Sequence, residues 1–340
     1  MSTSFYAQIV KKSHQYSIRT IAFYNLENLF DTVDDSSTYD ETSPIMESSE
    51  NRVLVYRKKI ENMAYVISQI GRKKTNTSPV IIGVCEVENK GVLDDLIMSK
   101  YLRDKGYEII HYNSPDKRGI DVALLYQSKY FNPIHHQIFN PNIYKENRKV
   151  YTRDQLLVSG YLDDDLVHII VNHWPSRSGG EEKSRPLREK AAYQNKRIIE
   201  QIRSRDENPK ILIMGDFNDD PTNSSLKEVL KTKSDKNKIK ENDIYNPYEN
   251  LFQKGLNTLG HRDHLNLFDM ILVSSHLIPK KKNDYSTYKL FQSKIFNESF
   301  LITRDGKFKG YPFRSFSNGV FTGGYSDHFP VYVYLIKSVP

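Results

Sequence analysis

Four short segments, far apart along the chain, each place polar side chains at the end of an apolar run. They span residues 21–27 (IAFYNLE), 80–86 (VIIGVCE), 211–218 (ILIMGDFN) and 325–328 (YSDH), the last directly before the apolar run 329–336. Each run has the length and side chains typical of a strand. A Glu, an Asp-x-Asn and an Asp-His at strand ends are the groups that a buried, metal-dependent phosphoester-cleaving site needs. Because the segments lie in both halves of the chain, they must converge in one core.

Further strands and helices are predicted between these segments, in two similar halves. The pattern predicts helices over 60–70 (ended by Gly71), over 92–102, and from Ser184 and Pro186 to about residue 202. It predicts strands over 107–112, 121–126, 156–161, 166–173, 210–214 and 268–273, with 156–161 and 166–173 forming a hairpin. Strands mixed with helices in this way favour an α/β sandwich, in which two β-sheets pack face to face with helices outside.

One domain is expected to span most of the chain. Residues 1–17 are expected to form a tail or an added strand, and residues 18–340 a single domain, because nothing that reads as a linker divides the core. Residues 34–51 read as a loop. The Lys-, Asn- and Tyr-rich stretches 222–266 and 279–318 are typical of binding loops, and equally of a disordered insert.

The composition limits the class of protein. With 38% hydrophobic residues the chain can build a sizeable core, and its formal net charge of +7 favours polyanionic or phosphorylated partners. The single cysteine, Cys85, excludes an internal disulfide and a Cys-rich zinc site. No apolar stretch reaches the length of a transmembrane segment and the N-terminus does not resemble a secretory signal, so we expect a cytoplasmic protein.

Asn25 and Glu86 are candidate metal-site residues. Strand alternation predicts that Asn25 and Glu27 lie on the same side of the chain. Glu86 ends an otherwise uncharged strand, where a carboxylate must be paired, hydrogen-bonded or metal-bound. Oxygen ligands of this type suit Mg²⁺. The alternative for Glu86 is a structural salt bridge.

The segments 211–218 and 325–328 supply candidate catalytic groups. Asp216 can align or deprotonate water while Asn218 holds that water or a phosphate oxygen, although DFNDDP also reads as an ordinary turn. His328 can stabilise charge on a phosphate oxygen if a carboxylate orients it, and Asp269, inside an apolar strand, is the candidate. Asp327 is then free to reach the metal or its waters.

His173 and Arg118 are candidates for contacts with the substrate, and each also has a structural interpretation. His173, at the end of the strand 166–173, can contact the phosphate or protonate the leaving oxygen; the alternative is a buried histidine packed beside Trp174. Arg118 can hold a phosphate, or belong to a solvated turn.

The order and spacing of these segments resemble the endonuclease/exonuclease/phosphatase superfamily, which includes deoxyribonuclease I, and most of all its bacterial members. The resemblance runs from about residue 21 to residue 336 and depends jointly on GDFN and the terminal SDH. It implies a four-layered α/β sandwich with mixed sheets and Mg²⁺- or Mn²⁺-dependent phosphoester hydrolysis. By position, it implies metal-site roles for Asn25 and Glu86, and it matches the remaining candidates to family positions: His173, Asp216, Asn218, Asp269, Asp327 and His328.

Three hypotheses about the function remain open. The first is a nuclease, which the basic, Tyr-rich loops at 231–240 and 280–282 mildly favour. The second keeps the site but places a phospholipid head group or another small phosphorylated molecule in it. The third is a scaffold that binds phosphate without cleaving it. The chain lacks the Trp-Cys-Asp-Arg stretch usual in inositol phosphatases and reads Leu267-Phe268-Asp269-Met270 instead, which counts against that branch.

Overall fold

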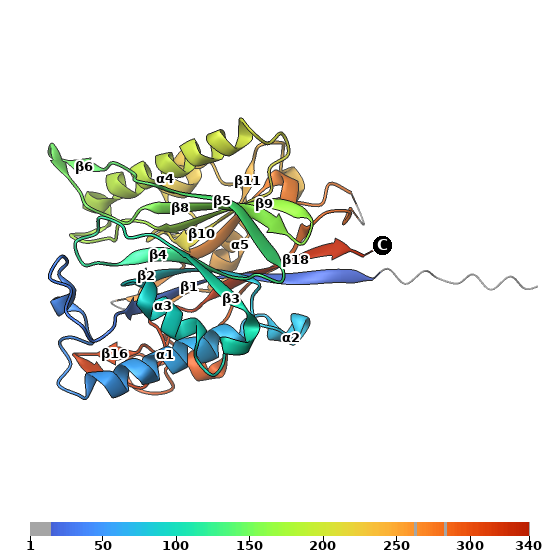
Figure 1. The fold of residues 1–340 in the computed structure, drawn as a ribbon. Coiled ribbons are helices and arrows are strands. Elements are labelled where there is room, and N and C mark those ends of the chain that lie inside the picture. Colours follow the sequence, from blue (N-terminus) through green and yellow to red (C-terminus); the bar gives the residue numbers. More distant parts are fainter. Residues whose placement is uncertain (1–14, 262–263, 282–283, 340) are drawn as a thin grey trace, which may run out of the picture.

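The computed structural model describes residues 15–261, 264–281 and 284–339. Two six-stranded sheets pack face to face, with α4 covering the outside of one and α1 and α3 covering the outside of the other (Figure 1). Each sheet is mixed, with one parallel pair at its centre: β1 with β2, and β9 with β10. The predicted four-layered α/β sandwich is confirmed.

The first sheet has the strand order β15-β18-β1-β2-β4-β3. Its strands are β1 (Tyr16–Leu29), β2 (Ile81–Val87), β3 (Tyr107–His111), β4 (Asp121–Gln127), β15 (Lys289–Ile295) and β18 (Val331–Ser338). Its outer face is covered by α1 (Arg52–Gln69) and α3 (Lys90–Ile97), and the short α2 (Arg72–Thr75) follows α1 after Gly71, whose φ of +71° suits glycine.

The second sheet has the order β11-β14-β10-β9-β8-β5. Its strands are β5 (Phe131–Phe139), β8 (Gln155–Leu162), β9 (Asp165–His173), β10 (Ile211–Asp216), β11 (Ile244–Tyr245) and β14 (Asp269–Ser274), and α4 (Glu181–Arg203) packs outside it. Short two-stranded ribbons complete the chain: β6 (Tyr144–Lys145) with β7 (Arg148–Lys149), β12 (Leu259–His261) with β13 (His264–Asn266), and β16 (Phe316–Ser317) with β17 (Val320–Phe321).

Alternate side chains of the same strand contribute to two different hydrophobic cores. In β1, Ile21 and Phe23 belong to the core between the two sheets, whereas Ala22 and Tyr24 belong to the core beneath α1 and α3. A methyl group placed on Gly83 would lie 2.6 Å from Met214 Sδ of the opposite sheet, so the sheets approach closely where the candidate site residues begin. Cys85 is buried, as its apolar surroundings predict.

Several sequence-based boundaries need correction. Residues 16–17 belong to β1 and not to a tail, while residues 1–14 lie outside the described residues. The helix predicted over 92–102 begins at Lys90 and ends at Ile97, and α4 begins at Glu181, so that Pro186 is inside it. Strands β5 and β15 were not predicted.

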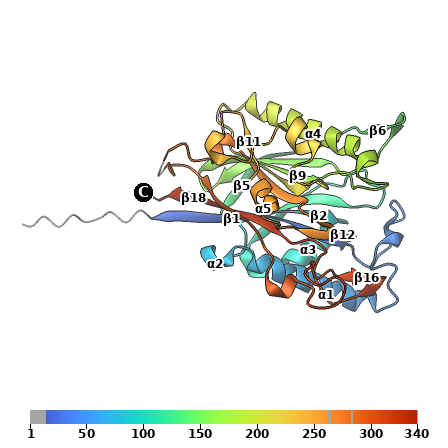
Figure 2. The same ribbon diagram turned by 180° about the vertical axis from the view of Figure 1, so that it is seen from behind.

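The long connections are structured in the parts described. Residues 222–266 contain a π-helical turn (Ser225–Val229), β11, α5 (Tyr248–Gln253), β12 and β13. Helix α5 lies on the side that faces the viewer in Figure 2, where Tyr248 Oη donates to the Tyr332 carbonyl of β18 at 3.2 Å. The alternative interpretation of these residues as a disordered insert is therefore wrong for the parts described. Within the described ranges, no helix has the length and apolarity needed to cross a membrane.

Candidate active site

One row of side chains crosses three neighbouring strands of the second sheet. In the register, Asp216 of β10 is the partner of His173 on β9 and of Asp269 on β14. All three side chains are buried; His173 and Asp216 end their strands after apolar runs, whereas Asp269 begins β14. The row places two carboxyl groups and an imidazole at one edge of the sheet.

The first sheet contributes Asn25 from β1 and Glu86 from β2. Glu86 has a φ of +58° and lies where the β2–β4 register shifts, so the strand bulges there. Its Oε2 accepts a hydrogen bond from the Asn28 backbone N–H at 3.0 Å. Asn25 Nδ2 donates to Glu86 Oε1 and to Asp216 Oδ2, both at 3.2 Å, and so joins the two sheets.

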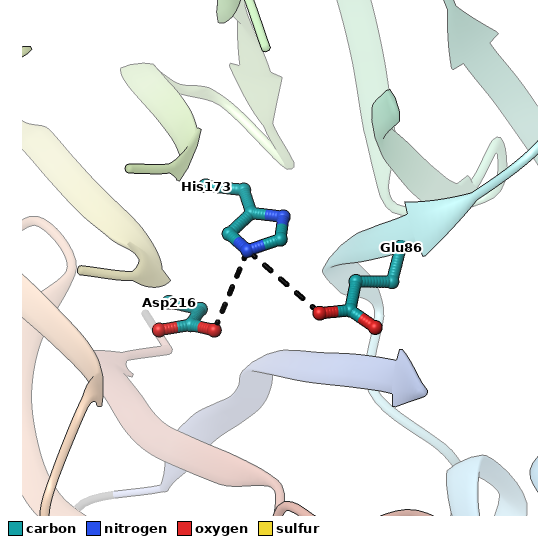
Figure 3. A group of neighbouring side chains, drawn as sticks. All are labelled: Glu86, His173 and Asp216. Atoms are coloured by element: carbon teal, nitrogen blue, oxygen red, sulfur yellow. Dashed lines mark ion pairs between the residues drawn. The ribbon is translucent and has the colours of Figure 1, made fainter. Parts of the chain in front are cut away.

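His173 lies between the carboxylates of Glu86 and Asp216 (Figure 3). Its Nε2 is 3.8 Å from Glu86 Oε1 and 3.6 Å from Asp216 Oδ2. Burial, with smaller effects of Arg153, Arg118 and His328, lowers the pKa of His173 well below its usual value. We therefore regard the imidazole as neutral and the two contacts as polar contacts, although their geometry is that of ion pairs.

His328 and Asp269 form a buried pair. His328 Nδ1 lies 2.7 Å from Asp269 Oδ2. Burial lowers the pKa of His328, but Asp269, Asp216 and Asp327 outweigh it and raise this pKa well above its usual value. These carboxylates favour the charged imidazole, and the expected contact between His328 and Asp269 is present.

Asp216 belongs to the second sheet, and its carboxyl group accepts a hydrogen bond from Asn25 of the first sheet. Burial raises its pKa to about 7; His328 opposes that rise, and the charges of Asp269 and Glu86 add to it. The Asn218 backbone N–H donates to Asp216 Oδ1 at 2.9 Å and fixes its orientation. The side-chain amide of Asn218 donates to the Trp174 carbonyl at 3.0 Å.

Asp327 and Arg118 lie at the margin of this cluster. Asp327 Oδ2 is 3.4 Å from a terminal nitrogen of Arg314. Arg118 is half exposed, lies 3.4 Å from Asp116 Oδ1, and is close enough to His173 to lower its pKa. The structure therefore brings Asn25, Glu86, His173, Asp216, Asp269 and His328 into one cluster, with Asn218, Asp327 and Arg118 around it.

The side chains of Asn25 and Glu27 do not share partners, contrary to the expected alternation. Glu27 has a φ of +47°, which breaks the strand pattern. Its carboxylate accepts hydrogen bonds from Arg314 Nε at 3.1 Å and from the Ser315 backbone N–H at 2.6 Å. Glu27 thus anchors the segment that carries Arg314, which sequence reasoning did not identify.

A buried ion pair beneath His173 was also missed. Arg153 donates from Nε to the His173 carbonyl at 3.2 Å, and its Nη1 lies 3.0 Å from Asp116 Oδ2. The charged dipeptide Arg153-Asp154 directly before β8 was the available signal.

An open cleft of about 1280 Å³ adjoins the cluster. Asn218, Phe268, Asp327 and Arg314 line it, together with Arg177 and the ribbon β12–β13. Both arginines are paired: Arg177 contacts Asp219 and Asp220 at 3.4 and 3.2 Å, and Arg314 contacts Glu27 and Asp327. The cleft offers polar and aromatic contacts with little unpaired positive charge on these two side chains.

The cluster fits a divalent cation. Glu86, His173 and Asp216 each offer a ligand atom, and these atoms lie within 4.8 Å of one another. Glu86 is the carboxylate of this group that retains solvent access. Two carboxylates with open positions for water or phosphate suit Mg²⁺ or Mn²⁺. Asn25 presents its amide nitrogen to both carboxylates, while its Oδ1 accepts from the Glu27 N–H at 2.9 Å.

The fold is shared with solved structures of low sequence identity. A truncated Caenorhabditis elegans TDP2 has a TM-score of 0.55 at 14% identity, over 94% of this chain and 97% of that one. A mannosyl-6-phosphatase from Bacteroides thetaiotaomicron has a TM-score of 0.53 at 18% identity, over 93% and 99%. Another Bacteroides thetaiotaomicron structure, from the endonuclease/exonuclease/phosphatase family, has a TM-score of 0.53 at 17% identity, over 96% and 97%.

No curated protein sequence matches the chain significantly. A family-level sequence profile, described as the Endonuclease/Exonuclease/phosphatase family, matches residues 20–337. That match covers nearly the whole sandwich and every candidate site residue. The chain therefore belongs to the endonuclease/exonuclease/phosphatase family, whose members are hydrolases that act on phosphoesters.

Proposed function

We propose that this protein is a metal-dependent phosphodiesterase that cleaves nucleic acid by attack of water, with Mg²⁺ or Mn²⁺ as its cofactor. The observation that carries the proposal is the row of His173, Asp216 and Asp269 across three strands, facing Glu86 and joined to His328. Distant parts of the chain bring carboxylates and two histidines of opposite protonation state together, which a purely structural role does not require.

Glu86 would hold the ion, with Asn25 hydrogen-bonded to its carboxylate and Asp327 at the margin of the cluster. When bound, Mg²⁺ or Mn²⁺ withdraws charge from the scissile phosphate and stabilises the leaving oxygen. Glu86 is suited to this role because a backbone N–H fixes one of its oxygens while the side chain retains access to solvent.

Asp216 would align the attacking water and accept its proton. A carboxyl group with a pKa of about 7 can take up a proton at neutral pH, and the Asn218 N–H keeps its second oxygen in place. Asn218 would contact the same water or a phosphate oxygen.

His328 would donate a hydrogen bond from Nε2 to a phosphoryl oxygen, since its Nδ1 is occupied by Asp269. Asp269 is then a positioning residue that keeps the imidazole charged. The neutral His173 would contact a second phosphoryl oxygen or the leaving oxygen, and Arg118 would hold a neighbouring phosphate.

Asp216→Asn tests the proposal. We expect hydrolysis of bis-p-nitrophenyl phosphate with Mg²⁺ to fall by about 10²- to 10⁴-fold, because the proton acceptor is lost while the shape is kept. The matched control is Asp235→Asn at an exposed turn, which should retain full activity. Thermal unfolding of both variants checks that the fold is intact. Near-wild-type turnover in folded Asp216→Asn would overturn the assignment, and turnover insensitive to EDTA would overturn metal dependence.

A second candidate function, hydrolysis of a small phosphorylated molecule, is favoured by the cleft. Its two arginines are already paired with carboxylates, which leaves little charge for a long polyanion. The fold does not distinguish these two functions, since the solved structures that share it include a D. rerio TDP2 complexed with single strand DNA product as well as the mannosyl-6-phosphatase. Nicking of supercoiled plasmid, compared with phosphate release from sugar phosphates and hydrolysis of sphingomyelin, distinguishes the two.

A further inference from the structure

The segment between β1 and α1 carries a cluster of acidic side chains away from the candidate active site (blue in Figure 1). Asp34, Asp40 and Glu41 each offer one carboxylate oxygen, and these oxygens lie within 4.8 Å of one another. Asp34 and Glu41 are exposed, whereas Asp40 is buried beneath them with 1% of its surface exposed. Among the described residues, no Lys, Arg or His forms an ion pair with any of the three.

The buried member of this cluster has an oxygen without a partner. Asp40 Oδ2 accepts a hydrogen bond from the Asp35 backbone N–H at 2.9 Å, but Asp40 Oδ1 is buried and accepts none. A buried carboxylate oxygen without a donor is costly unless a cation or a proton compensates it. This unsatisfied oxygen is an observation independent of the number of acidic residues.

Asp34 and Asp40 also act on each other electrostatically. The charge of Asp40 raises the pKa of Asp34, although Asp34 is exposed. Two ionised carboxylates whose oxygens lie within 4.8 Å of each other repel. A proton or a cation between them relieves that repulsion.

We propose that Asp34, Asp40 and Glu41 bind a divalent cation, best matched by Ca²⁺, at a site separate from the active site. Ca²⁺ binds oxygen ligands at about 2.4 Å, so oxygens up to about 4.8 Å apart can share one ion. Three carboxylates with solvent on one side suit the flexible coordination of Ca²⁺, whereas Mg²⁺ demands a near-ideal octahedron and usually takes only one or two carboxylates. The proposal does not depend on the function proposed above.

The position of this site gives the ion a structural effect on the cluster of catalytic candidates. The Asp31 N–H donates to Glu88 Oε2 at 2.7 Å, two residues after Glu86, and the Tyr39 N–H donates to the Lys117 carbonyl at 2.8 Å, next to Arg118. Because Tyr39 lies within residues 34–41, a cation that fixes them also fixes the backbone beside Arg118; Asp31 lies three residues before Asp34. We expect it to act as a stabilising clamp.

Terbium luminescence in the full-length protein tests the site directly. Tyr39 is exposed and precedes Asp40, so it can transfer excitation to a bound Tb³⁺. We expect saturable Tb³⁺ emission that Ca²⁺ displaces, together with a rise in Tm on adding Ca²⁺. In Asp40→Asn and in the milder Glu41→Gln, we expect Ca²⁺ affinity to fall at least about tenfold.

Two controls separate this site from the active site. Glu86→Gln removes a candidate active-site ligand, and Asp235→Asn removes an exposed acid elsewhere; both should keep the emission and the Tm shift. Emission lost only in Glu86→Gln, or a Ca²⁺-dependent Tm shift unchanged in Asp40→Asn and Glu41→Gln, would overturn the proposal. A wild-type protein without any Ca²⁺ response would overturn it as well.

Discussion

Lys59 is a buried cation that supports the candidate active site without taking part in it. It extends from α1, and its ammonium group donates to the carbonyls of Glu27 and of Asn28, the latter at 3.1 Å. Both of those residues have positive φ, and the Asn28 N–H is the donor that holds Glu86 Oε2. Burial lowers the pKa of Lys59 to about 8, so its charge at neutral pH is kept by these partners and by nearby Glu27 and Glu86.

We expect Lys59→Met to loosen the backbone at Glu27 and Asn28, and with it the hydrogen bond from Asn28 to Glu86. The buried carbonyl of Glu27 and the partly buried carbonyl of Asn28 lose their donor, which should destabilise the protein by about 1–3 kcal/mol. Because Glu86 is no longer held firmly, Mn²⁺ affinity measured by calorimetry should fall by about 10- to 100-fold. Lys58→Met, exposed on the same helix, is the matched control. Unchanged Mn²⁺ affinity in folded Lys59→Met would show that the position of Glu86 does not depend on the ammonium group.

At the residue scale, the sequence predicts groups that end apolar strands and misses groups whose partners are distant. Asp216, Asp269 and His328 were identifiable because a polar side chain beside a buried apolar run needs a partner. Arg314 and Asp116 lie in irregular segments, where no periodicity marks a side chain as facing the site. Their roles depend on contacts with Glu27 and Arg153, across 287 and 37 residues, which no local pattern encodes.

At the element scale, the β8–β9 hairpin is tied to the end of α4 through His168. Its Nδ1 lies 2.8 Å from Ser159 Oγ on β8, and its Nε2 lies 3.2 Å from Asp206 Oδ2 after α4. Burial lowers the pKa of His168 below its usual value, and Asp206 opposes this only in part. The folded protein therefore favours the neutral imidazole more than the unfolded chain does.

This shift gives a stability that depends on pH. The unfolded chain binds more protons than the folded protein just below pH 6.5, so the free energy of unfolding rises with pH in that range. The contribution is complete above about pH 6.5 and is lost as the pH falls through the lower, folded pKa. We expect urea unfolding of His168→Gln to show a flatter dependence between pH 7 and pH 5 than wild type. Equal slopes in the two proteins would contradict this account.

The sequence predicted the strands β2, β4, β9 and β10 because both of their faces are buried and they read as apolar runs. The edge strand β5 was missed because it contains Pro133 and is largely exposed. Strand β15 is also at an edge and mostly partly buried. Edge strands take their pairing from a neighbour, so their own sequence carries a weak signal.

At the scale of the whole molecule, charge is the remaining guide to the substrate. The formal net charge of +7 favours a polyanion, and the lysine-rich residues 231–240 were expected to contribute. In the structure, neither residues 231–240 nor the described residues 280–281 line the cleft beside the candidate active site. Net charge can therefore steer a nucleic acid toward the protein, while close phosphate contacts must come from the cleft itself.

The dependence of KM on salt separates a strand from a small molecule. For single strands, log K falls by about 0.7 per neutralised phosphate for each unit of log salt. Three contacted phosphates should thus raise KM for an oligonucleotide about 20-fold between 50 and 200 mM NaCl, at constant Mg²⁺. A substrate with one phosphate should change less than about threefold. If the oligonucleotide shows only the small change, the cleft engages one phosphate at a time, and hydrolysis of a small phosphorylated molecule becomes the better account of this site.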